Sequence, residues 1–190
     1  AGFIFADPKN TQLLMEAMQN PSGGDELGTL ATNDLSWFCV FSFDETGYVR
    51  DDEKDKLDSS AMLKSIKRGT EQANVERKNR GWSEITVVGW EKSPYYNDAT
   101  HNLEWAIRAT SENTPVVNHS TRLLGRRGVM KVVLITDPET LSDVLPRFQA
   151  LLKDFKFAKG NSYAEFRPGD KVAQYGLTAL VVGGAAAVAV

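Results

Sequence analysis

The sequence predicts an α+β fold in which helices pack on an antiparallel sheet meander, an α-β-α sandwich, followed by a C-terminal apolar helix rich in glycine and alanine. Three observations lead to this prediction. Strand-like segments joined by short turns follow one another between residues 85 and 136, and apolar residues recur at helical spacing on either side of them. The final residues, 172–190, carry no charge. We therefore divide the chain into a globular domain, residues 1–170, and a hydrophobic helix, residues 171–190.

The first part of the chain predicts one helix and two strands. The helix is capped by Asp7 or Thr11 and ends at Pro21, where the Asn-Pro pair is followed by two glycines. Strands are predicted at residues 28–32 and 37–43, and the second of these is dominated by aromatic and β-branched side chains.

The middle of the chain predicts a charged helix and a meander. An acidic run at residues 51–58 leads into a helix that ends at Gly81, and its narrow apolar stripe indicates a surface helix with one edge against the sheet. A further helix follows the meander, with Asp137 as its cap and Pro138 at its first position. The strands between the two helices are predicted at residues 85–90, 101–110, 114–124 and 129–136.

The composition is that of a folded, mildly acidic protein. Hydrophobic residues make up 42% of the 190 residues, and the net charge of −3 argues against nucleic acid as a partner, because nucleic-acid binders carry a basic surplus. Cys39 is the only cysteine, so no internal disulfide can form. Since it lies in the most apolar strand, we interpret it as a small buried residue and not as a nucleophile.

The sequence contains no recognisable catalytic motif. A nucleophile elbow, a P-loop, an H-E-x-x-H pair and a dinucleotide fingerprint are all missing. We therefore predict no catalytic residues, no metal ligands and no cofactor. If a turn near Glu112 joins the strands that hold the only two histidines, His101 and His119 lie about four residues out of register, which argues against a shared metal site.

Residues 94–101 are the first candidate for a ligand or partner site. Tyr95 and Tyr96 lie in a predicted loop, and Asp98 and His101 supply polar groups close by in the sequence. Aromatic side chains beside polar groups in a loop are typical of recognition sites.

The turn between the last two strands of the meander is a second candidate. Arg126 and Arg127 lie between Gly125 and Gly128, a pattern typical of a hairpin turn with two solvated arginines. An exposed arginine pair could dock an acidic partner or a phosphate headgroup.

The uncharged C-terminal segment predicts membrane attachment or self-association. A spanning helix needs about 20 apolar residues, so this segment is interpreted as the start of an anchor or as an assembly helix. Small residues at every fourth position, Ala179, Gly183 and Ala187, predict a helix–helix interface. A poorly structured linker is the alternative. The expected partners are a second copy of the chain, in a homo-oligomer, and the membrane.

Two resemblances add to these predictions. The order of elements resembles the PsbP/Mog1-like α-β-α sandwich. The segments DETGYVRDDE, GTEQANVERKNRG, VVGWEKSPYYNDATHNLEWA, TRLLGRRGVMKV and GNSYAEFRPGDKVAQYGLTALVVGG resemble a family of uncharacterised, membrane-anchored bacterial proteins whose shared domain has no assigned function. That second resemblance implies an upstream export signal, a domain outside the cytoplasm, in the periplasm, and a C-terminal hydrophobic anchor.

The leading functional hypothesis is a non-enzymatic, exported and membrane-anchored domain that acts through protein contacts as a self-assembling structural subunit. The alternative is a small-ligand-binding module or a hydrolase that uses residues 94–101, with His101 and Asp98 as acid and base. A third possibility is a cytosolic domain with an additional C-terminal helix.

Overall fold

The computed structural model describes residues 2–183, in which seven strands form one antiparallel sheet in the order β1-β2-β3-β7-β6-β5-β4. The strands are β1 (Phe3–Ala6), β2 (Glu26–Thr32), β3 (Trp37–Asp44), β4 (Ile85–Asn97), β5 (Asn102–Ser111), β6 (Thr114–Leu124) and β7 (Val129–Thr136). The α-helices are α1 (Pro8–Ala17), α2 (Ser59–Asn79), α3 (Leu141–Lys153) and α4 (Leu177–Val182). The predicted α+β class and antiparallel meander are confirmed.

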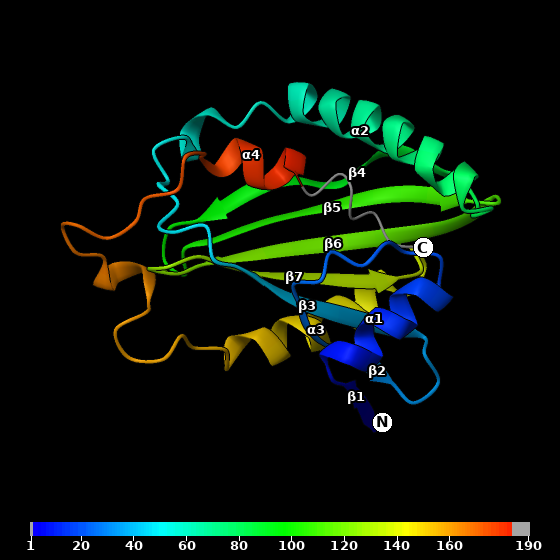
Figure 1. Ribbon diagram of the computed structural model, residues 1–190, viewed down its shortest axis with the longest axis horizontal. Coiled ribbons are helices and arrows are strands. Elements are labelled where there is room, and N and C mark those ends of the chain that lie inside the picture. The colour runs from blue at the N-terminus through cyan, green and yellow to red at the C-terminus, as the bar shows by residue number, and fades with distance from the viewer. Residues whose placement is uncertain (1, 184–190) are drawn as a thin grey trace.

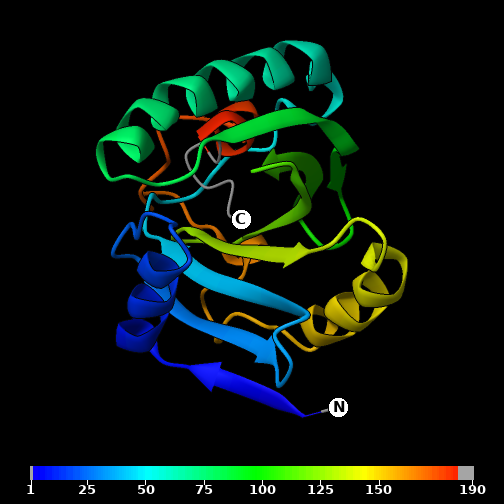
Figure 2. The same cartoon turned by 90° about the vertical axis from the view of Figure 1, so that its right-hand side faces the viewer.

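Helices cover both faces of the sheet (Figures 1 and 2). On one face α1, α2 and α4 contribute Met15, Ile66 and Leu177 to the larger hydrophobic core. On the other face Val144 and Phe148 of α3 pack on β3 and β7 in a second core. Figure 2 shows that the sheet curls toward its β4 edge, so that α4 lies inside the curve.

Short turns fix the register of the meander. Glu112 and Asn113 have positive φ angles of 51° and 67° and join β5 to β6, where the sequence predicts the turn. The N–H of Gly125 donates to the carbonyl of Gly128 (2.9 Å) and closes the connection from β6 to β7. A side chain at Gly128 would lie 2.1 Å from the carbonyl oxygen of Asp44, so the close approach of the two backbones requires glycine there.

Three elements differ from the prediction. Strand β4 continues through Pro94 to Asn97, so the first part of the predicted 94–101 loop is strand. A proline is tolerated there because β4 is an edge strand that, among the described strands, pairs only with β5, with register shifts along the pair. Strand β1 has no counterpart in the prediction. Helix α3 begins at Leu141, because the N–H of Thr140 donates to the carbonyl of Asp137 (3.2 Å) in a turn ahead of the helix.

The short helix α4 packs into the core of the domain. Leu177, Leu180 and Val181 are buried in the core that α1 and α2 share. The N–H of Thr178 donates to the carboxylate of Glu53 (2.9 Å), which fixes the start of the helix. None of the helices within residues 2–183 combines the length and the apolar composition needed to cross a membrane.

Candidate ligand-binding pocket

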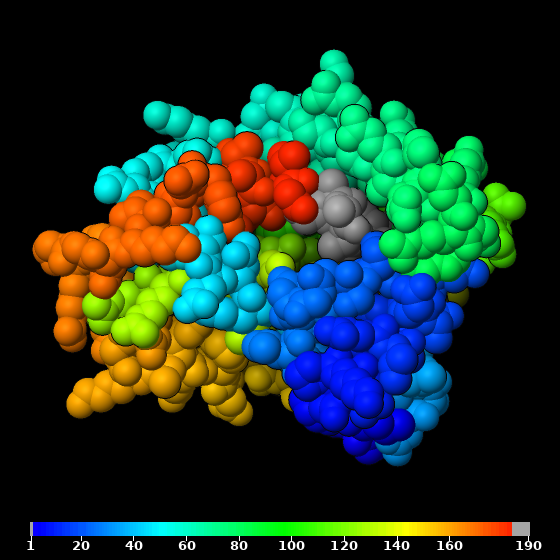
Figure 3. Space-filling model, in the orientation of Figure 1, coloured from blue at the N-terminus to red at the C-terminus, as the bar shows by residue number. Residues whose placement is uncertain are grey.

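A cavity of about 640 Å³ lies between the sheet, α4 and the segment that connects α1 to β2. It opens on the face shown in Figure 3, where the surface is hollowed between red α4 and the blue N-terminal segment. Its volume is in the range of small-molecule sites. The lining residues come from segments that are far apart in the sequence: Met15, Asn20, Pro21, Ser22, Gly23, Asp25, Glu26, Val40, Ser42, Asp44, Arg122, Lys131, Val133, Ile135, Tyr175, Ala179, Leu180 and Gly183.

A row of polar side chains crosses the sheet on the floor of the pocket. Arg122 on β6 lies opposite Lys131 on β7, Lys131 lies opposite Ser42 on β3, and Ser42 lies opposite Glu26 on β2. Directly opposed residues of an antiparallel pair point to the same face of the sheet. Strand pairing therefore brings together four polar side chains that are far apart in the sequence.

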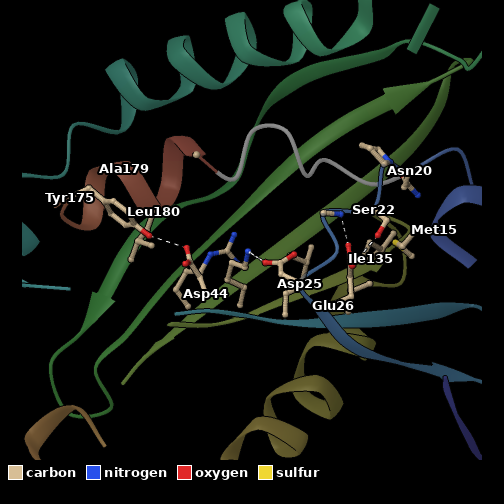
Figure 4. Close-up of a pocket in the computed structure, with 18 residues that line it drawn as sticks. Met15, Asn20, Ser22, Asp25, Glu26, Asp44, Ile135, Tyr175, Ala179 and Leu180 are labelled. Atoms are coloured by element: carbon tan, nitrogen blue, oxygen red, sulfur yellow. Dashed lines mark hydrogen bonds and ion pairs between the residues drawn. The ribbon is translucent and has the colours of Figure 1, made fainter. Parts of the chain in front are cut away.

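Most of the charged groups in the pocket have close partners (Figure 4). Lys131 forms an ion pair with Asp25. The carboxylate of Glu26 accepts hydrogen bonds from the Ser22 hydroxyl (2.9 Å) and from the N–H groups of residues 23 and 24 (2.7 and 3.0 Å). Asp44 accepts a hydrogen bond from the Tyr175 hydroxyl (2.9 Å).

Arg122 is the exception. Its side chain is 3% exposed, and within residues 2–183 its one hydrogen bond is a long contact of 3.5 Å to the carbonyl of Thr121. The guanidinium lies over the ring of Trp105, 4.7 Å from its centroid, which fixes its orientation. Burial lowers the pKa of Arg122 to about 10, partly offset by the negative charges of Asp25 and Asp44, so the group stays positive at neutral pH.

The remaining walls are apolar. Met15 from α1, Val40 from β3, Val133 and Ile135 from β7, and Leu180 from α4 surround the polar row. The pocket therefore offers a buried cation next to an apolar enclosure, an arrangement typical of sites for small organic molecules.

The side chains of the predicted site at residues 94–101 divide between the interior and the surface of the domain. Tyr96 is 7% exposed, and its hydroxyl donates to Asp51 (2.9 Å) and lies 3.1 Å from Nδ1 of His101. Burial and the hydrogen bond to Asp51 raise the pKa of Tyr96 far above its usual range. Asp98 forms an ion pair with Lys54 on the surface. Of these residues none lines the pocket described above.

Tyr95 remains available for recognition. Its side chain is 53% exposed at the edge of the sheet, and the ammonium of Lys92 lies 5.8 Å from its ring centroid.

The two arginines of the β6–β7 connection have different environments. Arg127 is exposed, as predicted, but the expectation that Arg126 is solvated is wrong. Arg126 donates to both carboxylate oxygens of Asp170 (2.6 and 2.7 Å) and to the carbonyl of Gly160 (3.0 Å). These bonds lower the pKa of Asp170 to about 2. Arg126 therefore holds the segment after α3 against the sheet, and leaves only Arg127 for an external anion.

Two of the three small residues of the predicted helix–helix stripe lie at the pocket. Ala179 and Gly183 line it, whereas Ala187 lies outside the described residues. Their assignment to a helix–helix interface stays a prediction.

Cys39 is completely buried, and burial raises the pKa of its thiol to about 12. In residues 2–183 no His, Cys, Asp or Glu residues are grouped so as to hold a metal ion.

Comparison with protein families identifies the chain. Over residues 1–190 it matches the family described as "Protein of unknown function (DUF2167)". The chain belongs to the DUF2167 family. This confirms the resemblance to a family without an assigned function, and none of the curated proteins matches this DUF2167 chain.

Two solved structures are similar to the DUF2167 chain at low identity. One is the solution structure of cyanobacterial PsbP (CyanoP) from Synechocystis sp. PCC 6803, with 11% identity, a TM-score of 0.47, and coverage of 83% of this chain and 82% of that chain. The other is PA94 from Pseudomonas aeruginosa, a protein of unknown function, with 10% identity, a TM-score of 0.36, and coverage of 83% of both chains.

Proposed function

We propose that this DUF2167 domain is a small-molecule-binding module whose ligand occupies the pocket between α4 and the sheet. The observation that carries the proposal is the buried guanidinium of Arg122, which lines a cavity of about 640 Å³ and has only one long hydrogen bond within the described chain. A buried charge with few hydrogen bonds is costly, and a bound ligand would supply further ones.

A pocket-filling variant tests this proposal. Ala179 lines the pocket from α4, so Ala179→Trp places a large side chain in the cavity. Gln174→Trp is the matched control, because Gln174 is exposed just ahead of α4 and does not line the pocket. A library of small metabolites is screened by thermal shift against the wild-type chain and both variants. The proposal predicts ligands that stabilise the wild type and Gln174→Trp but not Ala179→Trp; a screen in which every hit also stabilises Ala179→Trp contradicts it.

A second candidate function is self-assembly, as the sequence predicts. The edge strand β1 favours it, because Phe3, Ile4 and Phe5 are 45%, 50% and 64% exposed and, within residues 2–183, β1 pairs only with β2. An uncharged, apolar edge strand is a template for pairing with a second copy of itself. The predicted membrane anchor, the periplasmic location and the interface formed by Ala179, Gly183 and Ala187 belong to this same proposal.

Particle mass in detergent tests self-assembly. Ile4→Lys places a charge on β1, whereas Val88→Lys places the same charge on the opposite edge strand, where Val88 is 52% exposed. Assembly through β1 predicts monomers for the first variant and the wild-type oligomer for the second. The contribution of the tail is measured separately with a chain that ends at Gly183, because a chain that ends at Asp170 would also lose the buried side chains of α4. A monomeric wild type refutes the proposal.

A further inference from the structure

We propose that the pocket takes a zwitterionic ligand with an apolar body, a short apolar peptide, whose carboxylate binds Arg122 and whose ammonium binds Asp44. This inference rests on the proposed function, because it names the class of molecule that the same pocket would hold.

The charges that line the pocket favour a ligand with both signs. Three carboxylates, Asp25, Glu26 and Asp44, face two cations, Arg122 and Lys131, so the lining carries one net negative charge. A purely anionic ligand would add to this charge in a site of low dielectric constant, and a purely cationic ligand would leave the guanidinium of Arg122 without a close partner. A zwitterion leaves the net charge unchanged and can bind both signs.

The hydrogen bonds identify which two groups have capacity left. Asp25 forms an ion pair with Lys131, and Glu26 already accepts three hydrogen bonds from the loop that it caps. Asp44 accepts a single hydrogen bond, from Tyr175, and a carboxylate can accept about four. Arg122 has five N–H donors and only one long hydrogen bond. The planar guanidinium suits a carboxylate, with which it forms paired hydrogen bonds.

The separation of the strands that carry these two groups favours a peptide over a single amino acid. Asp44 lies on β3 and Arg122 on β6, with β7 between them, so their strands are about 10 Å apart. In a free amino acid the ammonium and carboxylate are attached to one carbon atom. In a dipeptide they lie on different residues and span more of this separation, and its side chains can contact the apolar walls formed by Val40, Val133 and Leu180.

Isothermal titration calorimetry with three matched probes tests the inference on the full chain. Leucyl-leucine carries both charges, N-acetyl-leucyl-leucine lacks the ammonium, and leucyl-leucinamide lacks the carboxylate. Each charge-assisted contact predicts roughly a 10-fold or greater loss of affinity when its group is removed. The wild type should therefore bind leucyl-leucine more tightly than either of the other probes.

Variants assign each end of the ligand. Arg122→Met should bind leucyl-leucine and its amide equally, and Asp44→Asn, which keeps the acceptor for Tyr175, should bind leucyl-leucine and its N-acetyl form equally. Arg108→Met is the control, because Arg108 lies on the neighbouring strand β5 in an ion pair with Glu91 and does not line the pocket. Since Arg122→Met removes a buried group, Arg122→Lys is measured beside it, and should keep part of the discrimination if the positive charge binds the carboxylate.

The outcomes separate this inference from the proposed function. Equal binding of the three probes, or no binding of any of them, overturns the zwitterion inference. The proposed function still stands in that case if the metabolite screen yields ligands that Ala179→Trp excludes. A screen without such ligands overturns both. Discrimination that survives in both Asp44→Asn and Arg122→Met overturns the assignment of the two ends.

Discussion

His119 is expected to make the domain sensitive to acid. It lies on β6 with 1% of its surface exposed, its ring packs edge-on against Phe148 of α3, and neither ring nitrogen has a hydrogen-bond partner among the described residues. Burial lowers its pKa to about 4 from the usual 6.5, and the carboxylate of Glu104, 3.9 Å away, offsets only part of this effect. The unfolded chain therefore binds a proton at a pH where the folded chain does not.

The sign and size of the effect follow from this difference in pKa. Because the folded-state pKa of His119 is depressed, stability is lost as the pH falls from about 6.5 toward about 4. A difference of about 2.5 pKa units corresponds to a loss of roughly 3 kcal/mol across this window. That is a large fraction of the free energy of unfolding of a typical domain.

Urea unfolding at a series of pH values measures the effect in the wild type and in His119→Met, which removes the titrating group and keeps an apolar side chain of similar size. The difference in unfolding free energy between the two chains should change by roughly 2 to 3 kcal/mol between pH 7 and pH 4.5, in favour of the variant at low pH. Thr121→Val is the matched control, because Thr121 is buried on the same strand and does not titrate. A pH-independent difference for His119→Met, or a pKa near 6.5 for His119 by NMR, would refute the reasoning.

Three further predictions concern packing. Phe148→Ala, at a fully buried position of α3, should lower the free energy of unfolding by about 3 to 5 kcal/mol in a denaturant titration, whereas Leu151→Ala, on the exposed side of the same helix, should change it little. Gly128→Ala should lower the midpoint of thermal unfolding, because the new side chain would meet the carbonyl of Asp44, and an unchanged midpoint would contradict this close approach. Cys39 should not react with a thiol reagent in the native state and should react fully in denaturant; rapid native reaction would show that the strand is exposed.

Local patterns in the sequence predict much of the fold. The alternation of apolar and polar residues predicts where the strands of the meander lie. The turn between β5 and β6 is at Glu112 and Asn113, close to the predicted position. The carboxylate of Asp7 accepts a hydrogen bond from the N–H of Asn10 (2.9 Å), as a predicted helix cap should. These features depend on residues close together in the chain, so the sequence alone carries the information.

The candidate site could not be predicted in the same way, because its geometry depends on contacts between distant segments. Arg122 and Lys131 become neighbours only through the pairing of β6 with β7. The sequence did place Arg122 within a predicted strand, directly before Leu123 and Leu124, where a charged side chain that becomes buried requires compensating contacts. Similarly, Pro94 can lie in a strand because β4 is at the edge of the sheet. Arg126 is buried because it forms an ion pair with the carboxylate of Asp170, a residue far away in the sequence.

The position of α4 connects the two proposals for this protein. Leu177 and Val181 anchor the helix in the core, while Ala179 and Gly183 line the pocket, so one short helix is part of both the fold and the candidate ligand site. The chain continues beyond Gly183 into the segment for which the sequence predicts membrane attachment or assembly. A ligand that contacts Ala179 would therefore stabilise the helix that precedes that segment in the chain. If both proposals hold, ligand binding and attachment are thermodynamically linked, and each should change the affinity of the other by the same factor.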